Sequence, residues 1–174
     1  MDRLHVATLN ILNLADRWPE RLPLLLADMA ALQPDLLGLQ EVVYVMQQDR
    51  LIGAAGEGRY AAVRGWAGRP EYGNSLLIRE PLAATQVDRL DLGLGRAAHR
   101  AVVALPDGST VLVVITHLHH TVDGDAQRDE QTTARCAARP SPRSSRSTWV
   151  AASGSRTSRL LPYSGRPAQP RTAA

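Results

Sequence analysis

The sequence predicts an α/β fold for roughly the first three quarters of the chain. Short apolar segments alternate with segments whose apolar residues recur every three or four positions, and turn-forming residues separate the two kinds. The chain has 174 residues, a length that suits one domain with its own core. Residues 135–174 lack this pattern and differ in composition.

The first predicted elements are a strand and a helix. Residues 4–10 alternate as a strand does, and this strand ends at Asn10. Asp16 is the predicted cap of the helix that follows, and residues 33–35 should end it. The apolar residues of this helix share one face: Leu22, Leu25, Leu26, Met29 and Leu32.

The next strand is a continuous apolar run. Residues 36–39 lie between turn signals, which is typical of a strand buried on both faces, and Gln40 and Glu41 stand at its exit. Residues 45–54 weakly indicate a second helix. A carboxylate at the end of a buried strand has rigid backbone behind it and open space in front. Glu41 is therefore a candidate ligand for a hard divalent cation such as Mg²⁺.

Several further strands are predicted downstream. They span residues 60–63, 73–79, 84–90, 99–105 and 110–116. The last two form the clearest pair, because residues 106–109 read Pro-Asp-Gly-Ser, a turn tetrad. The second strand of this pair ends by presenting Thr116 and His117. Residues 126–134 then suit a helix.

Charge divides the chain into two unlike regions. Residues 1–130 carry 12 arginines and 17 acidic residues, whereas residues 131–174 carry 8 arginines and no acidic residue. An out-of-frame reading of a GC-rich gene yields such an Arg, Ser, Pro and Ala composition. We therefore expect a frameshift near residues 133–139, so that residues 1–134 are the domain and residues 135–174 are a disordered tail. The alternative is a native basic tail that binds nucleic acid through phosphate contacts.

Other compositional features limit the kind of protein. Cys136 is the only cysteine, so neither an intrachain disulfide nor a thiolate zinc site can form. The N-terminus has no apolar signal core, and no apolar stretch is long enough to span a membrane. We expect a cytoplasmic protein with no obligate protein partner.

Histidines and aspartates crowd the segment after the last strand and leave two interpretations open. His117 is followed by the candidate ligands His119, His120, Asp123 and Asp125. Metallo-β-lactamase-like zinc hydrolases also place Thr-His after an apolar strand, but the Asp and final His of their pattern are Thr121 and Val122 here. The other interpretation is a single imidazole, His117, that donates a hydrogen bond to a phosphate oxygen.

Five short motifs occur in order within residues 4–134. They are Thr8-Leu9-Asn10, Leu39-Gln40-Glu41-Val42, the Gly73-Asn74-Ser75 segment within residues 72–79, Thr116-His117-Leu118 and Arg128-x-x-Gln131. Together they resemble the endonuclease/exonuclease/phosphatase superfamily, which includes exonuclease-III-like and deoxyribonuclease-I-like enzymes. The resemblance implies a four-layer α/β sandwich, in which two β-sheets lie face to face between helices. It also implies phosphoester hydrolysis with Mg²⁺ or Mn²⁺, on nucleic acid or on small phosphodiesters or phosphomonoesters.

The resemblance implies roles for four residues. Glu41 matches the metal-binding glutamate, and Asn10 matches the asparagine beside it, which we expect to serve the metal and catalysis. His117 is predicted to be catalytic and to bind the substrate phosphate, and Asn74 is predicted to contact that phosphate too.

Two later motifs of the superfamily are absent from this sequence. They are Gly-Asp-Phe-Asn and Ser-Asp-His, and the chain has no Phe, no Asp after Asp129 and no His after His120. These motifs supply the groups that activate water and complete the catalytic pair. The sequence therefore predicts a truncated or frameshifted, inactive member of the superfamily, in which the strands before residue 117 leave an exposed inner face.

Overall fold

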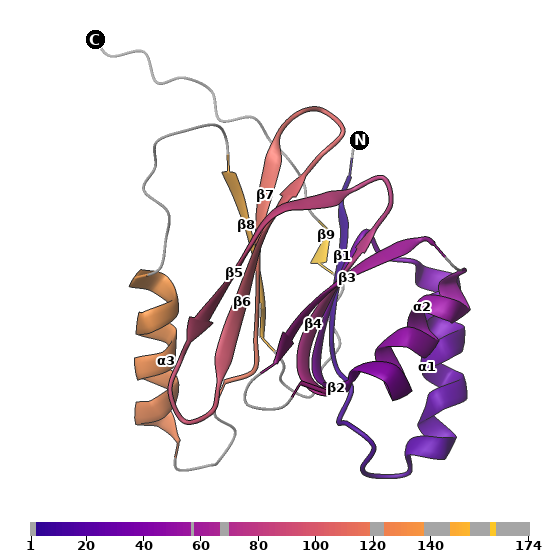
Figure 1. Cartoon of the computed structure of the whole chain (residues 1–174), viewed down its shortest axis with the longest axis horizontal. Coiled ribbons are helices and arrows are strands. Elements are labelled where there is room, and N and C mark those ends of the chain that lie inside the picture. The colour runs from indigo at the N-terminus through magenta and orange to yellow at the C-terminus, as the bar shows by residue number, and fades with distance from the viewer. Residues whose placement is uncertain are drawn as a thin grey trace.

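A computed structural model describes residues 3–56, 58–66, 70–118, 124–137, 147–153 and 161–162. The elements in these residues form two β-sheets that lie face to face between helices (Figure 1). The helices are α1 (Trp18–Leu32), α2 (Asp49–Ala55) and α3 (Asp125–Ala137), and a π-helical turn, η1 (Tyr44–Gln48), precedes α2. The predicted four-layer α/β arrangement is confirmed.

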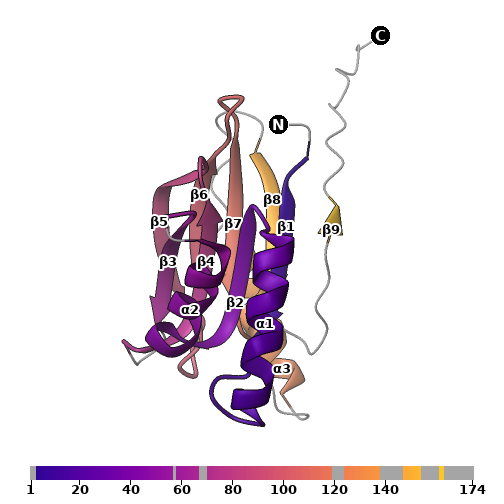
Figure 2. The ribbon, with the colours of Figure 1, turned by 90° about the vertical axis from the view of Figure 1, so that its right-hand side faces the viewer.

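Sheet A has five strands in the order β3, β4, β2, β1, β9. Their bounds are β1 (His5–Asn10), β2 (Leu36–Val43), β3 (Tyr60–Trp66), β4 (Tyr72–Arg79) and β9 (Leu161–Pro162). β1 and β2 are parallel, and Asn10 lies opposite Gln40. The helices α1 and α2 lie on the outer face of this sheet (Figure 2). Because this pair is parallel, the carboxyl ends of β1 and β2 lie at the same end of the sheet.

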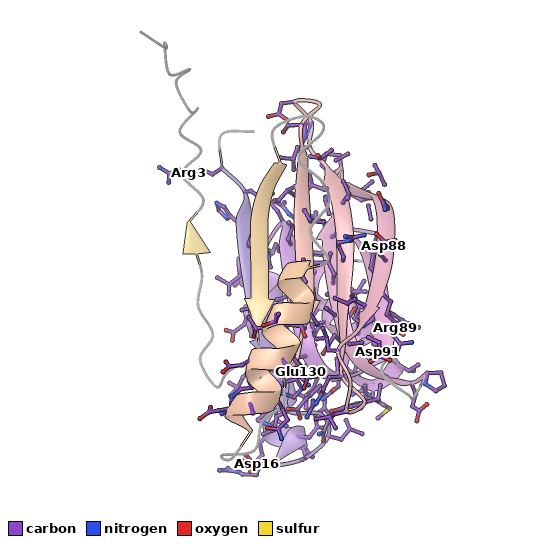
Figure 3. The ribbon with its side chains drawn as sticks, turned by 90° about the vertical axis from the view of Figure 1, so that its left-hand side faces the viewer. Arg3, Asp16, Asp88, Arg89, Asp91 and Glu130 are labelled. Atoms are coloured by element: carbon purple, nitrogen blue, oxygen red, sulfur yellow. The ribbon has the colours of Figure 1, made fainter. Side chains whose placement is uncertain are left out.

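Sheet B has four strands in the order β5, β6, β7, β8. Their bounds are β5 (Ala83–Asp91), β6 (Ala97–Ala104), β7 (Thr110–Thr116) and β8 (Ser147–Ser153). β6 and β7 form the predicted hairpin, in which Gly108 takes a φ of 79°, an angle that glycine adopts without strain. α3 covers the outer face of sheet B, and Glu130 marks it in Figure 3.

Two strands lie within residues 135–174, where the sequence predicted no element. β8 pairs in parallel with β7 along its whole length, and β9 pairs with His5 and Val6 of β1. A strand at a sheet edge is held by backbone hydrogen bonds. Such pairing does not require a periodic pattern of apolar side chains, so the sequence pattern did not predict these strands. The tail predicted from composition otherwise lies outside the described residues, apart from the end of α3.

The two sheets bury an apolar core between them. Sheet A contributes Leu36, Leu76 and Ile78, and sheet B contributes residues that include Val103 and Ile115. All five side chains are at most 2% exposed. The expectation of an exposed inner face is therefore wrong, because sheet B itself covers the inner face of sheet A. Two further clusters fill the spaces under α1 and α2 and beneath α3.

The start of α1 differs from the prediction. Asp16 is not the cap, because Arg17 holds that position with a φ of 58° and no side-chain cap hydrogen bond. The loop before α1 is instead tied from within the helix. The Arg21 guanidinium donates to the backbone oxygens of Ile11, Asn13, Ala15 and Asp16. Among the described residues, no helix has the length and apolar character required to cross a bilayer.

Candidate functional site

Glu41 lies in a β-bulge of β2. Leu39 pairs with Ser75 and Val42 with Gly73, so two residues of β2 face one residue of β4. Glu41 has a φ of 55°, a left-handed conformation that costs a non-glycine residue about 1–3 kcal/mol. The bulge also shifts the strand's alternation, since Val42 packs in the outer cluster with Leu39. Without it, Glu41 would face the helices rather than the space between the sheets.

Two asparagines hold the Glu41 carboxylate. Asn10 Nδ2 donates to Oε1 over 2.9 Å, and Asn13 Nδ2 donates to Oε2 over 3.3 Å. Asn10 Oδ1 accepts from the Leu12 backbone N–H, which fixes the orientation of this amide. Each carboxylate oxygen has a second lone pair. The carboxylate is thus oriented by the protein and can still bind a cation.

Asn13 belongs to a loop that neighbouring elements hold in place. Its backbone oxygen accepts from Arg21 and, over 2.6 Å, from Gln47 Nε2. Gln47 in turn accepts from the backbone N–H of Val43, just beyond the bulge. Leu12 and Asn13 both have positive φ values, 56° and 37°. The loop conformation is therefore enforced by α1 and η1, and with it the contact from Asn13 to Glu41.

His117 brings the second sheet to this carboxylate. It follows β7 directly, is 8% exposed, and its Nε2 lies 3.5 Å from Glu41 Oε1. On the other side of the ring, Arg96 Nη1 lies 3.0 Å from Nδ1. Because β1, β2 and β7 end at the same end of the sandwich (Figure 1), a carboxylate of sheet A and an imidazole of sheet B meet there.

Asn74 is the residue of β4 that lies opposite the bulge of β2. It is 7% exposed, and its Nδ2 donates to the backbone oxygen of Ala97 over 3.4 Å. The Thr116 hydroxyl donates to the same oxygen. The Asn74 backbone oxygen accepts from the Tyr44 hydroxyl, and burial raises the pKa of Tyr44 to about 12. Asn74 thus joins β4 to β6. Unlike Asn10 and His117, it has no hydrogen bond or ion pair with Glu41 in the described part of the chain.

The donor set around Glu41 suits a hard cation better than zinc. Within residues 3–56, 58–66, 70–118 and 124–134, no three His, Cys, Asp or Glu side chains gather as a metal cluster. Mg²⁺ needs only one or two carboxylates, and water and substrate phosphate complete its shell. A structural or catalytic zinc site needs at least three protein ligands. One carboxylate supported by amides fits the first requirement.

Three of the histidine and aspartate candidates for a zinc site cannot be compared with this geometry. His119, His120 and Asp123 lie outside the described residues. Asp125 begins α3 and forms an exposed ion pair with Arg128. It therefore serves the first turn of a helix, where a negative charge is stabilising.

A separate cavity of about 300 Å³ lies on the other side of sheet A. It lies between α1 and the outer face of β1 and β2, and Leu9, Leu25, Met29 and Leu37 line it with Asp28. The lining is mainly apolar and holds a single carboxylate. The cavity therefore has no part in the cluster around Glu41.

Two residues of the cluster were missed from the sequence. Asn13 stands three positions beyond Asn10 in a loop, and Arg96 stands in the turn before β6. The repeated Asn-x-x-Asn spacing at the end of a predicted strand was a usable signal for Asn13. Arg96 gave no local signal, because it reaches His117 only through the pairing of β6 with β7.

The comparisons with known proteins agree on the fold. A model of the endonuclease/exonuclease/phosphatase family matches residues 7–166, which extends beyond residue 134. The solved structures that resemble the chain include TDP2 of D. rerio, humanized by 14 mutations (TM-score 0.67, 17% identity, 79% of this chain and 56% of that chain). No curated protein sequence matches.

Two more solved structures are similar. The human nocturnin catalytic domain with bound sulfate has a TM-score of 0.69 and 20% identity over 78% of this chain and 57% of that chain. The mannosyl-6-phosphatase of Bacteroides thetaiotaomicron has a TM-score of 0.63 and 18% identity over 77% of this chain and 58% of that chain. This chain therefore spans less than two thirds of each of the three solved chains.

Proposed function

Because the chain belongs to the endonuclease/exonuclease/phosphatase family, we propose that Glu41 and His117 form the metal- and phosphate-binding half of a phosphoester hydrolase site. The observation that carries this proposal is the meeting of an oriented carboxylate and an imidazole, 3.5 Å apart, across two sheets. The family match also favours this function over that of a metallo-β-lactamase-like hydrolase.

Each residue has a distinct part in the proposed site. Glu41 holds Mg²⁺ or Mn²⁺, and Asn10 orients Glu41 while a lone pair of its Oδ1 remains for the cation. Asn13 fixes the second carboxylate oxygen. His117 donates a hydrogen bond to a phosphate oxygen, and Asn74 supports that edge of the phosphate site. A divalent cation would supply charge stabilisation at the phosphoryl group.

Magnesium binding is the direct test of Glu41. We expect weak Mg²⁺ binding by the full chain in isothermal titration calorimetry and its complete loss in Glu41→Gln, which keeps the shape but removes the charge. The matched control is Glu20→Gln, an exposed glutamate of α1 whose partner is Arg17. Equal Mg²⁺ affinity in Glu41→Gln and the unaltered chain would place the cation elsewhere.

We further propose that the chain does not turn over substrate by itself. The groups that activate water in the family are absent from its sequence, and general-base catalysis contributes about 10²- to 10⁴-fold. We attribute this absence to an out-of-frame reading beyond residue 134. The two strands in this region, β8 and β9, give the counter-hypothesis of an in-frame extension.

The nucleotide sequence and an activity assay decide between these two hypotheses. We expect another frame beyond codon 133 to encode Gly-Asp-Phe-Asn and, later, Ser-Asp-His. A chain continued in that frame should hydrolyse bis-p-nitrophenyl phosphate in Mg²⁺ at least about 10²-fold faster than the present chain.

Two results would contradict this proposal. If neither of the other frames encodes those motifs, the frameshift is wrong. If the present chain hydrolyses bis-p-nitrophenyl phosphate, and Glu41→Gln and His117→Ala abolish that hydrolysis, its inactivity is wrong while the site stands.

The phosphoester substrate is proposed only as a class. One of the similar structures is named a mannosyl-6-phosphatase, so small phosphoesters are to be assayed as well as nucleic acid. A cytoplasmic location is proposed as well, and the single cysteine is compatible with a reducing compartment.

A further inference from the structure

Arg96 is placed by the turn that joins β5 to β6. Its backbone N–H donates to Gly93, and its backbone oxygen accepts from Leu92. Gly93 and Gly95 have φ values of 76° and 68°, which keep this turn tight. The side chain is thus delivered from a fixed backbone position to the face of His117 that points away from Glu41.

The contact between Arg96 and His117 permits one direction of donation. Every guanidinium nitrogen of arginine is a donor or lacks an available lone pair, and the group stays protonated in proteins. At 3.0 Å, Nδ1 of His117 must therefore accept from Arg96 Nη1. A neutral imidazole carries its proton on one nitrogen only, so the proton lies on Nε2.

The tautomer determines what His117 offers to the site. Nε2 is the nitrogen that lies 3.5 Å from Glu41 Oε1, so an N–H group faces the carboxylate and the space beside it. A carboxylate in place of Arg96 would accept a hydrogen bond from Nδ1–H and leave Nε2 without a proton toward the site, which is the arrangement of a general base. Arg96 produces the opposite arrangement.

We infer that Arg96 is a positioning residue that holds His117 in its Nε2–H tautomer, so that His117 meets the site as a hydrogen-bond donor and not as a base. The assignment of a phosphate oxygen as the acceptor rests on the proposed function. The tautomer itself does not, because it follows from the Arg96 contact alone.

Nitrogen-15 NMR of the imidazole rings tests the tautomer without any activity assay. The full chain is labelled with ¹⁵N-histidine and measured in metal-free buffer at a pH well above about 6.5, the ordinary pKa of histidine. His117→Gln assigns the His117 signals by their loss. His5, whose side chain is exposed, serves as the internal reference for the mixture of tautomers in water.

The expected spectrum shows a proton on His117 Nε2 alone and an Nδ1 shifted from that of His5 by an accepted hydrogen bond. Arg96→Lys should keep this pattern, because an ammonium group also only donates. Arg96→Met keeps an unbranched stem but removes the donor, so the Nδ1 signal should move toward that of His5.

Two outcomes would overturn the inference. One is a His117 signal in the unaltered chain that matches His5 or shows the proton on Nδ1, and the other is a His117 signal that Arg96→Met leaves unchanged. The first outcome is measured in the unaltered chain, and His117→Gln serves there only to assign the signals. If the full chain does not bind Mg²⁺ but shows the Nε2–H signal of His117, the proposed function is refuted and this inference stands.

Discussion

Gly65→Ala is expected to destabilise the domain by about 3 kcal/mol or more, at the upper end of the range for overpacked cores. Gly65 lies in β3 opposite Asn74, and a β-carbon there would overlap Cγ, Cδ2 and Nδ1 of the His99 ring in β6. Cγ lies at the base of the imidazole, so rotation of the ring cannot clear the overlap. The two sheets would have to separate at the end of the sandwich that carries the site.

Thermal unfolding measures this effect. For a domain of this size, 3 kcal/mol corresponds to a melting temperature lower by roughly 6–12 °C. The control is Gly53→Ala in α2, where a β-carbon meets nothing within 4 Å and alanine favours the helix. His99→Ala combined with Gly65→Ala should recover part of the loss. A Gly65→Ala chain as stable as the parent would show that the sheets are farther apart than described.

Acid is expected to destabilise the domain through His99. Burial and, second, the positive charge of Arg89 lower the pKa of His99 to about 4 from 6.5. Arg89 lies on β5 between Asp88 and Asp91 (Figure 3). His99 Nε2 also has no hydrogen-bond partner among the described residues, so no acceptor at that nitrogen favours the charged ring. The native state thus resists a proton that the unfolded chain accepts.

The sign of the pH dependence follows from the two pKa values. Above about pH 6.5 neither the folded nor the unfolded chain binds the His99 proton, so the contribution of His99 to stability is constant. Between pH 6.5 and about 4 only the unfolded chain binds it, so stability falls as pH falls, by about 3 kcal/mol in all. Below pH 4 both states are protonated and the loss from this group ends.

Urea unfolding at several pH values separates His99 from other groups. The free energy of unfolding should fall between pH 6.5 and 4 in the parent chain. In His99→Gln this fall should be smaller than in the parent chain by about 3 kcal/mol. Equal pH profiles for the two chains would mean that His99 is already hydrated in the folded state.

Much of the fold could be predicted because its strongest signals are local. The apolar face of α1 packs against sheet A as expected except for Leu32, which is 53% exposed. The Pro-Asp-Gly-Ser turn between β6 and β7 also appeared as expected. In sheet A, β1 and β4 were predicted to within one residue at each end, β2 and β3 were predicted too short, and β9 was not predicted. The strand predicted for residues 36–39 runs to Val43, since polar residues at a bulge do not end the backbone pairing.

The candidate site was predictable only where chain order reflects spatial order. Asn10 and Glu41 end or nearly end neighbouring parallel strands, so their proximity followed from a parallel pair. The left-handed backbone conformation of Glu41 could not be predicted, because glutamate, unlike glycine, has no preference for a positive φ. Asn13 depends on a loop that Arg21 fixes from α1, and Arg96 depends on strand pairing in the other sheet.

The division of the site between two sheets has a consequence for how such a domain can be recombined. All of sheet A except β9 is built before residue 80, and all of sheet B is built after residue 82. Glu41 with its asparagines therefore belongs to one half of the chain, and His117 with Arg96 belongs to the other. A chimera that joins either half to its counterpart from another family member would inherit only one side of the site. It would regain the other side only if the apolar surfaces between the sheets matched well enough to set the carboxylate and the imidazole back within reach of each other.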